Sequence, residues 1–518
     1  MKRIPIIKMI CVVLSLWMLA VLALTSCADA PTDGETPEAE PGEQGSEETT
    51  EETPSEPDKG KEEVRLPLDY LPTEKYKGVT VNFLEWSVAG HTPGMSWVPW
   101  EEIDVDAADG DPLHNAIYDR NGYIEETYEV EITKEYLSID GSPAYLSHFR
   151  SASQAGDQTW QVITLRTLNI ASLINEGLMK DMNTLSNLHT DMPWWNQDSV
   201  QSFTTGKALF FAAPEMLLRD KGATSAMFYN QTVAAQYEIV DLYDLASSGE
   251  WTMDAMIEYG EQVTEDLDGD DQLNSAEDMF GLSGSQRSIP FHMFAGTDNK
   301  LAIIDQEGYL QNAIDDDVID IWQTLLDEVM YTDFYTGTNV DSSTLPDKDF
   351  DFFKADKALF YIDMVKSVNT LRDMTSDYGV LPIPKYDEYQ EDYSTLVWTH
   401  HDCVLGIPSS VTNEDAVSTV LEHMNYISYY DVYPLFYDTI ILGKSARDAQ
   451  SKEMLQLIFR VRSFDPGQYW LSSTLHGSGG FLTLVEQNKR NIASVWAGIE
   501  KQTMTEIEKF NDRVDEKW

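Results

Sequence analysis

Between residues 79 and 163 the sequence switches repeatedly between a strand pattern and a helix pattern. Apolar and polar residues alternate from Val79 to Phe83, which predicts a half-buried strand. Strand patterns occur at 79–83, 130–132 and 160–163, and helical spacing of apolar residues occurs at 113–128 and 145–153. This rhythm is typical of a parallel sheet covered by helices, so we expect an α/β fold.

Polar and aromatic side chains follow the ends of two of these strands. In open α/β sheets, ligands bind beyond the carboxyl ends of the strands. The first strand is followed by Glu85, Trp86 and Ser87, and the third by Thr164 and Arg166. We therefore predict that these residues contact a ligand.

The N-terminus has the pattern of a secretory signal. Basic residues precede an apolar run over 9–24, and the run ends in Leu-Thr-Ser-Cys at 24–27. The run is too short and too abruptly followed by polar residues to favour a spanning helix. A cysteine after small residues resembles the bacterial lipobox. We expect residues 1–26 to be a lipoprotein signal peptide, and Cys27 to be lipidated on the extracellular face of a bacterial cell membrane.

Residues 27–64 are rich in Pro, Gly, Thr and Glu and contain no aromatic residue, which predicts a disordered acidic tether. The formal net charge of the whole chain is −54, and acidic runs continue beyond the tether. Such a charge makes nucleic acid and anionic lipid poor partners. We expect membrane association through the lipid anchor only.

Cysteine usage indicates how the folded part is stabilised. Of the three cysteines, Cys11 would leave with the signal and Cys27 would take lipid, so Cys403 remains alone and no disulfide framework is expected. Stability must then come from a buried core, and a chain of 518 residues with 42% hydrophobic residues can supply two lobes.

An ordered series of short segments follows. They are EGLMKDM at 176–182, GKALF at 206–210 with Pro214, FYN at 228–230, WTMD at 251–254, FKADKALF at 353–360 and DYGVLPIP at 377–384. The series resembles the family 1 extracellular solute-binding proteins of ATP-driven (ABC) importers, which are related to maltose- and oligosaccharide-binding proteins. The resemblance covers nearly all of the chain after the tether.

The resemblance implies a type II periplasmic-binding-protein-like fold, in which each of two lobes is a mainly parallel sheet flanked by helices. Lobe 1 would comprise 65–212 and 364–408, lobe 2 would comprise 217–360 and 411–518, and several strands would form the hinge. It also implies a monomer that is not an enzyme and that delivers a solute, a sugar or oligosaccharide, to permease subunits. Asp356 replaces the usual glycine, and His400-His401-Asp402 replaces small residues, so the resemblance does not name the ligand.

One acidic segment resembles an EF-hand calcium loop. The oxygen ligands at its expected positions are Asp266, Asp268, Asp270, Gln272 through its carbonyl, Asn274 and Glu277. Asp271 stands where the loop needs a glycine-like turn, which Asp tolerates better than most residues. We expect a structural Ca²⁺ here, and the alternative is an empty acidic surface loop.

Further candidate ligand residues come from aromatic side chains and from the chain crossings. Aromatic rings stack on sugar faces, although most tryptophans pack in cores. The additional candidates are Trp195, Glu215, Asp363, Trp398, His400, Tyr469 and Trp470. We expect Trp86 and Trp398 to form the main stacking platforms.

Two other functions remain open at this point. A polysaccharide-processing surface lipoprotein would need paired carboxylates, and this acidic chain offers many without a recognisable catalytic motif. A carbohydrate-binding adhesin without a transport role is the other. A zinc site at His400 and His401 is disfavoured, because no further ligands follow at zinc spacing.

Overall fold

The computed structural model describes residues 65–86, 101–105, 108–136, 141–239, 241–273, 277–337, 350–441, 449–477 and 479–517. All of them belong to one unit, Arg65–Trp518. The predicted signal peptide, Cys27, the acidic tether, Ser87 and Asn274 lie outside the described residues.

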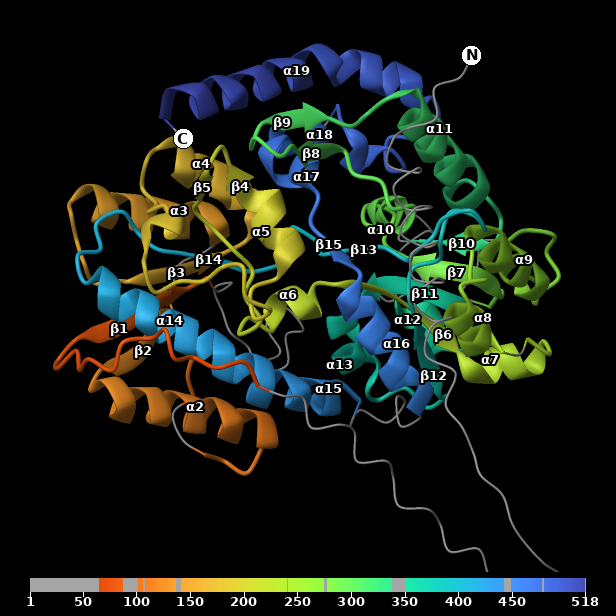
Figure 1. Cartoon of the computed structure of the whole chain (residues 1–518). Coiled ribbons are helices and arrows are strands. Elements are labelled where there is room, and N and C mark those ends of the chain that lie inside the picture. The colour runs from red at the N-terminus through yellow and green to blue at the C-terminus, as the bar shows by residue number, and fades with distance from the viewer. Residues whose placement is uncertain are drawn as a thin grey trace, which may run out of the picture. The chain divides into compact units, whose positions relative to one another are not determined.

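The first sheet has the strand order β14-β3-β1-β2. Strand β1 (Thr80–Glu85) is parallel to β2 (Glu131–Tyr136) and to β3 (Val162–Leu165), and β14 (Val404–Gly406) is antiparallel to β3. The predicted strand and helix rhythm is thus confirmed within a few residues. The helices of this region are α2 (Pro112–Tyr128), α3 (Gly141–Gln154), α4 (Ile170–Asn175) and α14 (Glu414–Ile427), drawn around the sheet in Figure 1.

Local chemistry explains where α2 begins. Asp111 is its N-cap, and the Asp111 carboxylate accepts hydrogen bonds from the backbone N–H groups of Leu113 and His114. Pro112 occupies the first helical position, where its missing N–H costs no intrahelical bond. The helix buries Leu113, Ile117 and Ile124 at helical spacing.

The second sheet has the strand order β10-β7-β11-β6-β12. These strands are β6 (Ser225–Asn230), β7 (Phe280–Gly284), β10 (Tyr335–Thr336), β11 (Ala358–Met364) and β12 (Tyr378–Leu381). Strand β7 is parallel to both of its neighbours, whereas β6 is antiparallel to both of its own. The first sheet is mainly parallel as expected, and the second is mixed.

Helices cover this second sheet and continue beyond it. They are α7 (Gln231–Gln236), α8 (Leu242–Ser248), α9 (Met253–Val263), α10 (Ile289–Gly296), α11 (Asp316–Leu325), α12 (Phe350–Lys354), α13 (Val368–Leu371) and α16 (Ala449–Arg460). Helix α9 lies close to β7 because Gly260 and Gly281 face each other without side chains.

The remaining elements connect these layers. They are η1 (Thr167–Asn169), η2 (Met182–Thr184), α5 (Gln197–Phe203), β4 (Thr204–Thr205), β5 (Ala208–Leu209), α6 (Arg219–Gly222), β8 (Ala302–Ile304), β9 (Leu310–Asn312), η3 (Leu326–Met330), η4 (Val365–Ser367), β13 (Thr395–Leu396), η5 (Ser428–Val432), α15 (Tyr433–Ile441), β15 (Arg462–Ser463), α17 (Pro466–Trp470), α18 (Ser472–Leu475), η6 (Phe481–Thr483) and α19 (Ile492–Lys517). In Figure 1, α19 runs past α18 and β9 toward the C-terminus.

Two parts of the predicted lobe division are wrong. Strand β12, expected in lobe 1, pairs with β6 of the second sheet. Helix α14, expected in lobe 2, packs against β1 and α2 of the first sheet. An apolar strand or helix pattern fixes which face is buried, but it does not say against which sheet. Only β14, within the expected 364–408 segment, joins the first sheet.

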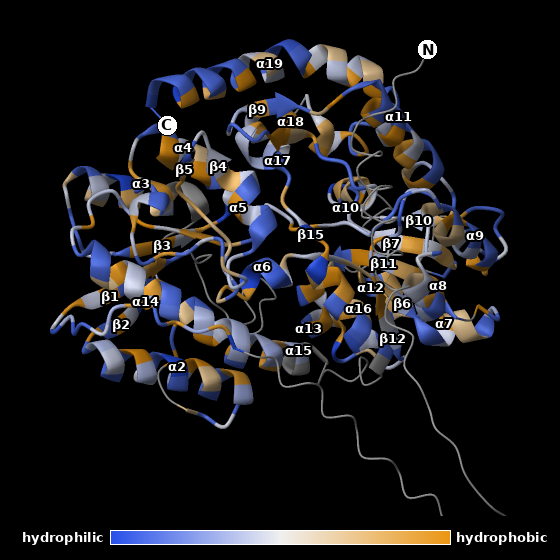
Figure 2. Cartoon of the chain, viewed as in Figure 1, coloured by the Kyte–Doolittle hydropathy of each residue, from blue (hydrophilic) through white to orange (hydrophobic). Residues whose placement is uncertain are grey.

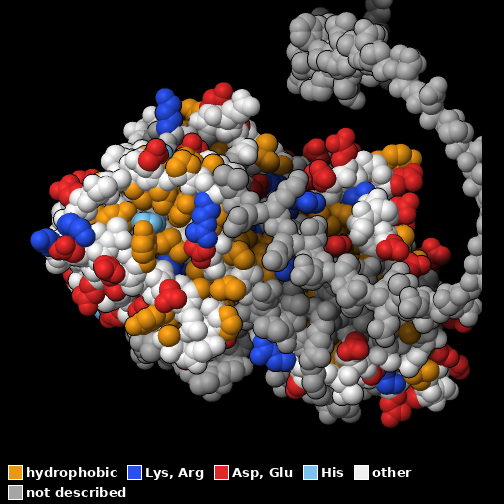
Figure 3. Space-filling view, turned by 60° about the horizontal axis from the view of Figure 1, so that its bottom comes forward, with side chains coloured by type: hydrophobic (Ala, Val, Ile, Leu, Met, Phe, Trp, Pro, Cys, Tyr) orange, Lys and Arg blue, Asp and Glu red, His pale blue; other side chains and the backbone are white. Residues whose placement is uncertain are grey.

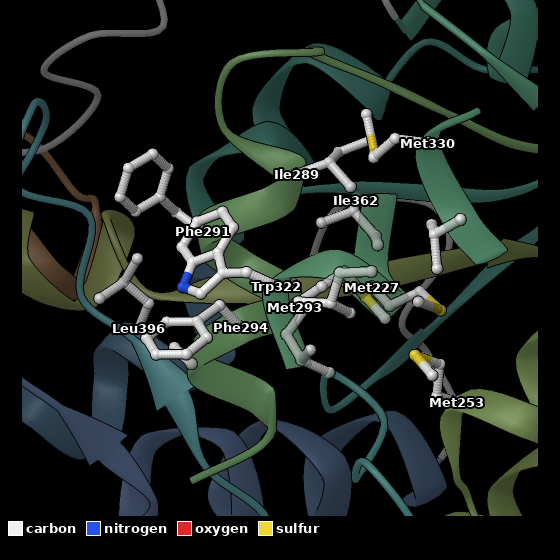
Figure 4. Packing of buried hydrophobic residues seen from close by; sticks show 14 of the residues in the cluster. Met227, Met253, Ile289, Phe291, Met293, Phe294, Trp322, Met330, Ile362 and Leu396 are labelled. Atoms are coloured by element: carbon white, nitrogen blue, oxygen red, sulfur yellow. The ribbon is translucent and has the colours of Figure 1, made fainter. Parts of the chain in front are cut away.

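Large apolar clusters fill the space around both sheets. In the cluster that packs around the second sheet, Trp322 stacks on Phe294 and on Phe481, with ring-centroid distances of 4.9 Å each. Figure 4 shows Phe291, Met293 and Phe294 of α10 pointing into this core. In Figure 2, β7 and β11 of the second sheet contain hydrophobic residues, drawn in orange, and the helices around this sheet are of mixed colour.

Two expectations from the sequence can be compared with the described residues. Within them, no helix is both long and apolar enough to cross a membrane. Among the described residues, Cys403 is a free cysteine, and it is buried.

Candidate functional site: a buried junction between the two sheets

The carboxyl ends of β1 and β3 carry the first part of the site. The Trp86 backbone N–H donates to the Thr164 hydroxyl at 3.1 Å. The Arg166 guanidinium lies over the Trp86 ring, 4.5 Å from its centroid, and donates to the His400 carbonyl at 3.1 Å. The first sheet therefore reaches the segment at residue 400 through two residues predicted at its strand ends.

A stack of rings meets these residues from the other side. Trp398 and His400 stack with centroids 4.7 Å apart and planes 22° apart, and His400 stacks on His476 at 5.2 Å and 25°. Phe291 and His292 of α10 lie against Trp398, each at 5.4 Å. We call Trp398, His400, His476, Phe291 and His292 the histidine stack.

Backbone contacts hold Trp398 and His400 in this place. Trp398 and His400 lie in the connection between two strands. It leads from β13, which packs against the second sheet, to β14 of the first sheet. The Trp398 carbonyl accepts hydrogen bonds from the N–H groups of His401 and Asp402, which closes a turn. The Asp402 carboxylate then accepts from the Thr167 N–H at 3.0 Å and from the Thr167 hydroxyl at 2.6 Å. This turn is thereby fixed to the end of β3.

Burial keeps the imidazole rings neutral. Loss of solvation lowers the pKa of His400 and of His292 to about 4, and that of His476 to about 3. The pKa of the Asp402 carboxyl is raised to about 8, again mainly by burial. At neutral pH the imidazole rings of His292, His400 and His476 therefore each have one N–H donor and one nitrogen acceptor.

Several polar atoms at the junction are shielded from solvent and have no hydrogen-bond partner in the part of the chain that the structure describes. Neither ring nitrogen of His476 has one, and the same is true of His292 Nε2 and of the Trp86 indole N–H. Both amide atoms of Gln468 are also unpartnered, and α17, which carries Gln468, packs against η1 after Arg166. Buried polar groups are nearly always paired in native structures, so these need an explanation.

A second group of buried residues lies close to Trp86 and consists only of acidic and basic side chains. The Arg219 guanidinium contacts Glu85 at 3.3 Å and Glu102 at 3.1 Å. Lys221 contacts Glu215 at 2.8 Å, and Arg462 contacts Glu215 at 2.9 Å and Asp220 at 2.7 Å. We call these the charge cluster; its members are Glu85, Glu102, Glu215, Arg219, Asp220, Lys221 and Arg462.

The charge cluster accounts for two residues that the sequence placed at the ligand. Glu85 is 0% exposed and Glu215 6%, and each is held by a cation of the chain itself. Burial raises the pKa of Glu102 to about 7, which lowers the negative charge that Arg219 must balance. These carboxylates stabilise the passage of α6 between the sheets.

Other predicted ligand residues are engaged elsewhere. The Trp195 indole donates to Glu422 at 3.0 Å, and the Tyr469 hydroxyl donates to the Ser202 carbonyl, and both rings are buried in the core. The Asp363 carboxylate accepts from the hydroxyls of Tyr361 and Ser367. Trp470 packs edge-on against Phe510. Trp398 itself is only 4% exposed, so it is no open platform.

The acidic loop after α9 has part of the predicted geometry. Carboxylate oxygens of Asp266, Asp268 and Asp278 all lie within 4.8 Å of one another. Asp271 takes the left-handed conformation, with φ 62°, that the loop requires, and its N–H donates to Asp266 at 2.7 Å. The buried Asp278, one residue beyond Glu277, completes this cluster. Calcium binding stays a prediction.

Comparisons with known proteins identify the fold. No protein-family model matches the sequence, and no curated protein matches it either. Among solved structures, a sugar transporter from Rhizobium etli in an open conformation has a TM-score of 0.52 at 12% identity, covering 83% of this chain and 99% of its own. A cyclo/maltodextrin-binding protein complexed with maltotetraose has a TM-score of 0.51 at 12% identity, covering 84% and 98%.

A third example is the maltose/maltodextrin-binding domain MalE from Bdellovibrio bacteriovorus bound to maltotriose, with a TM-score of 0.50 at 13% identity over 83% of this chain and 99% of that one. The chain has the type II periplasmic-binding-protein-like fold. In this type II fold the two sheets are joined by several crossings, which is the arrangement expected from the resemblance.

Sequence reasoning missed three partners that the type II fold brings to the junction: Phe291, His292 and His476. One signal was present, because the chain has only nine histidines. Four of them, His292, His400, His401 and His476, come together at this junction from distant segments. The small number of histidines could have drawn attention to these four as candidate site residues. Their proximity to one another is visible only in the fold.

Proposed function

We propose that this protein is the solute-binding component of an ABC importer, and that it captures a carbohydrate at the junction between its two sheets. The observation that carries the proposal is the histidine stack beside Trp86 and Arg166. Aromatic rings meet there with polar atoms that have no hydrogen-bond partner among the described residues, where the chain crosses from one sheet to the other. The type II fold and the sugar-binding proteins that share it agree with this role.

The proposed mechanism is closure of two lobes around the solute. A ligand that contacts both lobes only in the closed state shifts the population toward that state by its differential affinity. Trp86 and Arg166 would act from the first sheet, and His476 and His292 from the second. The closed form would then be the one that the permease subunits recognise.

A saccharide screen tests this function. Purified residues 65–518 would be mixed with mono- and oligosaccharides, followed by thermal shift and then by calorimetry on each compound that raises the melting temperature. We expect a 1:1 complex and no change in the saccharide. Release of shortened products would favour the polysaccharide-processing alternative, and binding to no saccharide would refute the carbohydrate assignment.

The lipid anchor is a separate part of the proposal and rests on the N-terminal sequence. Cys27→Ala should move the protein from the membrane fraction into the medium, because lipid on Cys27 is the proposed attachment. Cys403→Ala is the matched control, since Cys403 is buried in the folded part. Membrane retention of the Cys27→Ala protein would contradict the anchor and leave the binding role intact.

A further inference from the structure

We propose that Arg219 is a positioning residue that holds Trp86 and Trp398 in place for the solute, and that Glu85 and Glu102 share one proton that controls this hold. The inference rests on the proposed function, because it concerns the regulation of the same site. It gives a role to Arg219 and Glu102, which no sequence motif indicates.

Arg219 lies between the two tryptophans that the sequence predicts as stacking platforms. Its guanidinium Nη1 donates to the Trp86 carbonyl at 2.6 Å. The Arg219 carbonyl accepts from the Ala223 N–H at 2.8 Å, and the Ala223 carbonyl accepts from the Trp398 N–H at 2.9 Å. Arg219 is therefore bonded to the end of β1 on one side and, through the end of α6, to the crossing toward β14 on the other.

Two carboxylates meet the guanidinium of Arg219, and we call Glu85 and Glu102 the glutamate pair. Glu85 Oε1 lies 3.3 Å from Nη2, and Glu102 Oε1 lies 3.1 Å from Nε. These two nitrogens are bonded to the same carbon, so the two carboxylates are close neighbours. Glu102 Oε2 accepts from the backbone N–H groups of Leu218 and Arg219, at 2.6 and 2.9 Å, where α6 begins. Glu102 thus contacts both the side chain and the backbone of Arg219.

The backbone around Glu102 is fixed to the elements of the first sheet. Arg120 of α2 donates to the carbonyls of Glu102 and Ile103, at 3.1 and 2.5 Å. Lys134 of β2 donates to the Asp104 carbonyl at 2.6 Å. Because its backbone is held, Glu102 cannot easily move away when its charge changes, and the change acts on Arg219.

The charges of the cluster do not balance. It contains four carboxylates and three cations, and two of the cations, Lys221 and Arg462, both contact Glu215 and Asp220. The remaining cation, Arg219, faces both carboxylates of the glutamate pair. One negative charge is therefore in excess in a buried place, and a proton on one of the two carboxyls removes it.

The oxygens of the glutamate pair also lack donors. Glu85 is 0% exposed and Glu102 1%, and Glu85 Oε2 and Glu102 Oε1 accept no hydrogen bond from the described residues. A proton held by the pair supplies a donor at this place. Burial and the neighbouring charge of Glu85 raise the pKa of the Glu102 carboxyl to about 7, against the opposing effect of Arg219.

The other titratable or charged groups that face the glutamate pair and Arg219 do not replace this proton. They are Arg120 of α2, Tyr136 of β2, Tyr145 of α3, Cys403 before β14, and Glu101, which is paired with Lys134. Burial raises the pKa of both tyrosines and of the cysteine, so they are uncharged at neutral pH. Arg120 stays charged, and Asp104 acts on it more strongly than Glu102 does.

The charge of the whole molecule favours the protonated pair. The chain carries a formal net charge of −54, and on the face shown in Figure 3 acidic side chains are spread over the surface, with fewer Lys and Arg. A negative field attracts protons and so opposes ionisation of a further carboxyl.

The proton decides how Arg219 is shared among its acceptors. When Glu102 is ionised, two carboxylates compete with the Trp86 carbonyl for the guanidinium. When Glu102 is protonated, the attraction toward it weakens, and Arg219 is left to Glu85 and to the carbonyl of Trp86, the next residue in the chain. Proton uptake should therefore strengthen the hold on Trp86, and proton release should weaken it.

The test follows Trp86 in the purified protein without any solute. The protein would be labelled with 5-fluorotryptophan, and the Trp86 resonance identified as the fluorine NMR signal that is absent from Trp86→Phe. We expect this signal to move between two limits as the pH is changed, with a midpoint at about pH 7. Because no saccharide is used, a saccharide screen without binding would refute the proposed function and leave this result readable.

Three variants assign the proton. Glu102→Gln resembles the protonated carboxyl, so its Trp86 signal should stay at the acid limit at every pH. Glu85→Gln removes the neighbouring negative charge, so the midpoint should move to lower pH by at least about one unit. Asp402→Asn is the control: burial raises the pKa of Asp402 to about 8 at the same junction, but its carboxylate is bonded to Thr167, so the midpoint should stay.

The proposal is overturned by a Trp86 signal that does not move between about pH 5 and about pH 9, or by a transition that persists in Glu102→Gln. If Glu102→Gln does not fold, an unchanged midpoint in Glu85→Gln overturns it as well. Loss of the transition in Asp402→Asn alone would assign the proton to the turn after Trp398 and would also contradict the proposal.

Discussion

The charge cluster and the histidine stack are two buried polar regions at the same junction, and they differ in how their polar atoms are satisfied. In the charge cluster, the three cations each contact carboxylates of the chain at 2.7–3.4 Å. In the histidine stack, both ring nitrogens of His476 and Nε2 of His292 have no hydrogen-bond partner among the described residues. Each cation of the first region therefore has a counter-charge within the chain, whereas the second region holds neutral ring nitrogens that no described residue contacts through a hydrogen bond.

This difference shows why burial of polar residues does not by itself identify a binding site. Glu85 and Glu215 follow the rules for a ligand residue in sequence, yet the chain supplies their counter-charges. His476 follows no such rule, yet neither of its ring nitrogens has a hydrogen-bond partner among the described residues. The informative property is an unfilled hydrogen bond, since an unpaired buried group costs free energy that a ligand can restore.

The largest expected effect breaks the charge cluster. Arg219→Met would leave Glu85 and Glu102 buried without their cation, so the free energy of unfolding should fall by about 3–5 kcal/mol. Urea denaturation followed by tryptophan fluorescence measures this. A loss below about 1 kcal/mol would mean that the cluster does not have the structural role assigned to it.

The next effect distinguishes the neutral stack by its response to acid. The pKa of His476 is held near 3 in the folded state and returns to its ordinary value of about 6.5 on unfolding, so between these pH values the unfolded chain binds more protons. Stability therefore falls as pH is lowered through this window, by about 1.4 kcal/mol per pH unit for one proton. His476→Phe should lose stability less steeply than the parent from pH 6.5 to pH 4.5.

Comparing how stability changes with pH in the parent and in His476→Phe cancels the contributions of other titrating groups. Glu102 and Asp402, whose pKa values burial raises to about 7 and about 8, favour the folded state at lower pH, but they do so in both proteins. Denaturation at several pH values gives the difference. Parallel pH profiles for the parent and the variant would show that His476 is not held neutral by the fold.

A smaller effect concerns the acidic loop after α9, a third group of polar residues. If it binds calcium, free calcium at about ten times the dissociation constant should stabilise the protein by about 1.4 kcal/mol through mass action. Asp268→Ala should abolish the shift in melting temperature, and Asp317→Ala, in the exposed acidic start of α11, should not. An identical melting curve in calcium and in chelator would leave this loop as acidic surface.

The smallest effect sets a baseline for the charge cluster. Arg287 and Glu486 form an ion pair whose side chains are 56% and 28% exposed. Arg287→Met should change the free energy of unfolding by less than about 1 kcal/mol, because water and salt screen an exposed pair. A loss as large as that of Arg219→Met would remove the distinction between buried and exposed pairs in this molecule.

Much of the first sheet was predictable because its signals are local. The alternation at 79–83 and the helical spacing at 113–128 correspond to β1 and α2 within two residues. The assignment of β12 and α14 to lobes was wrong, because their apolar patterns state that a face is buried without naming the sheet that covers it. Trp86, Arg166, Trp398 and His400 were predicted as ligand residues and do lie together, but their contact with a ligand remains a prediction.

Local sequence is sufficient for the α/β class, for the order of the segments and for conformations set by neighbouring residues, such as the cap at Asp111 and the left-handed turn at Asp271. The pairing of buried polar atoms, by contrast, depends on the three-dimensional fold. Glu85 and Arg219 are 134 residues apart, and His476 meets His400 and Phe291 from separate segments. Hydrogen bonds and ion pairs act over a few ångströms, so their partners depend on how the chain returns to one place, which local sequence patterns do not encode.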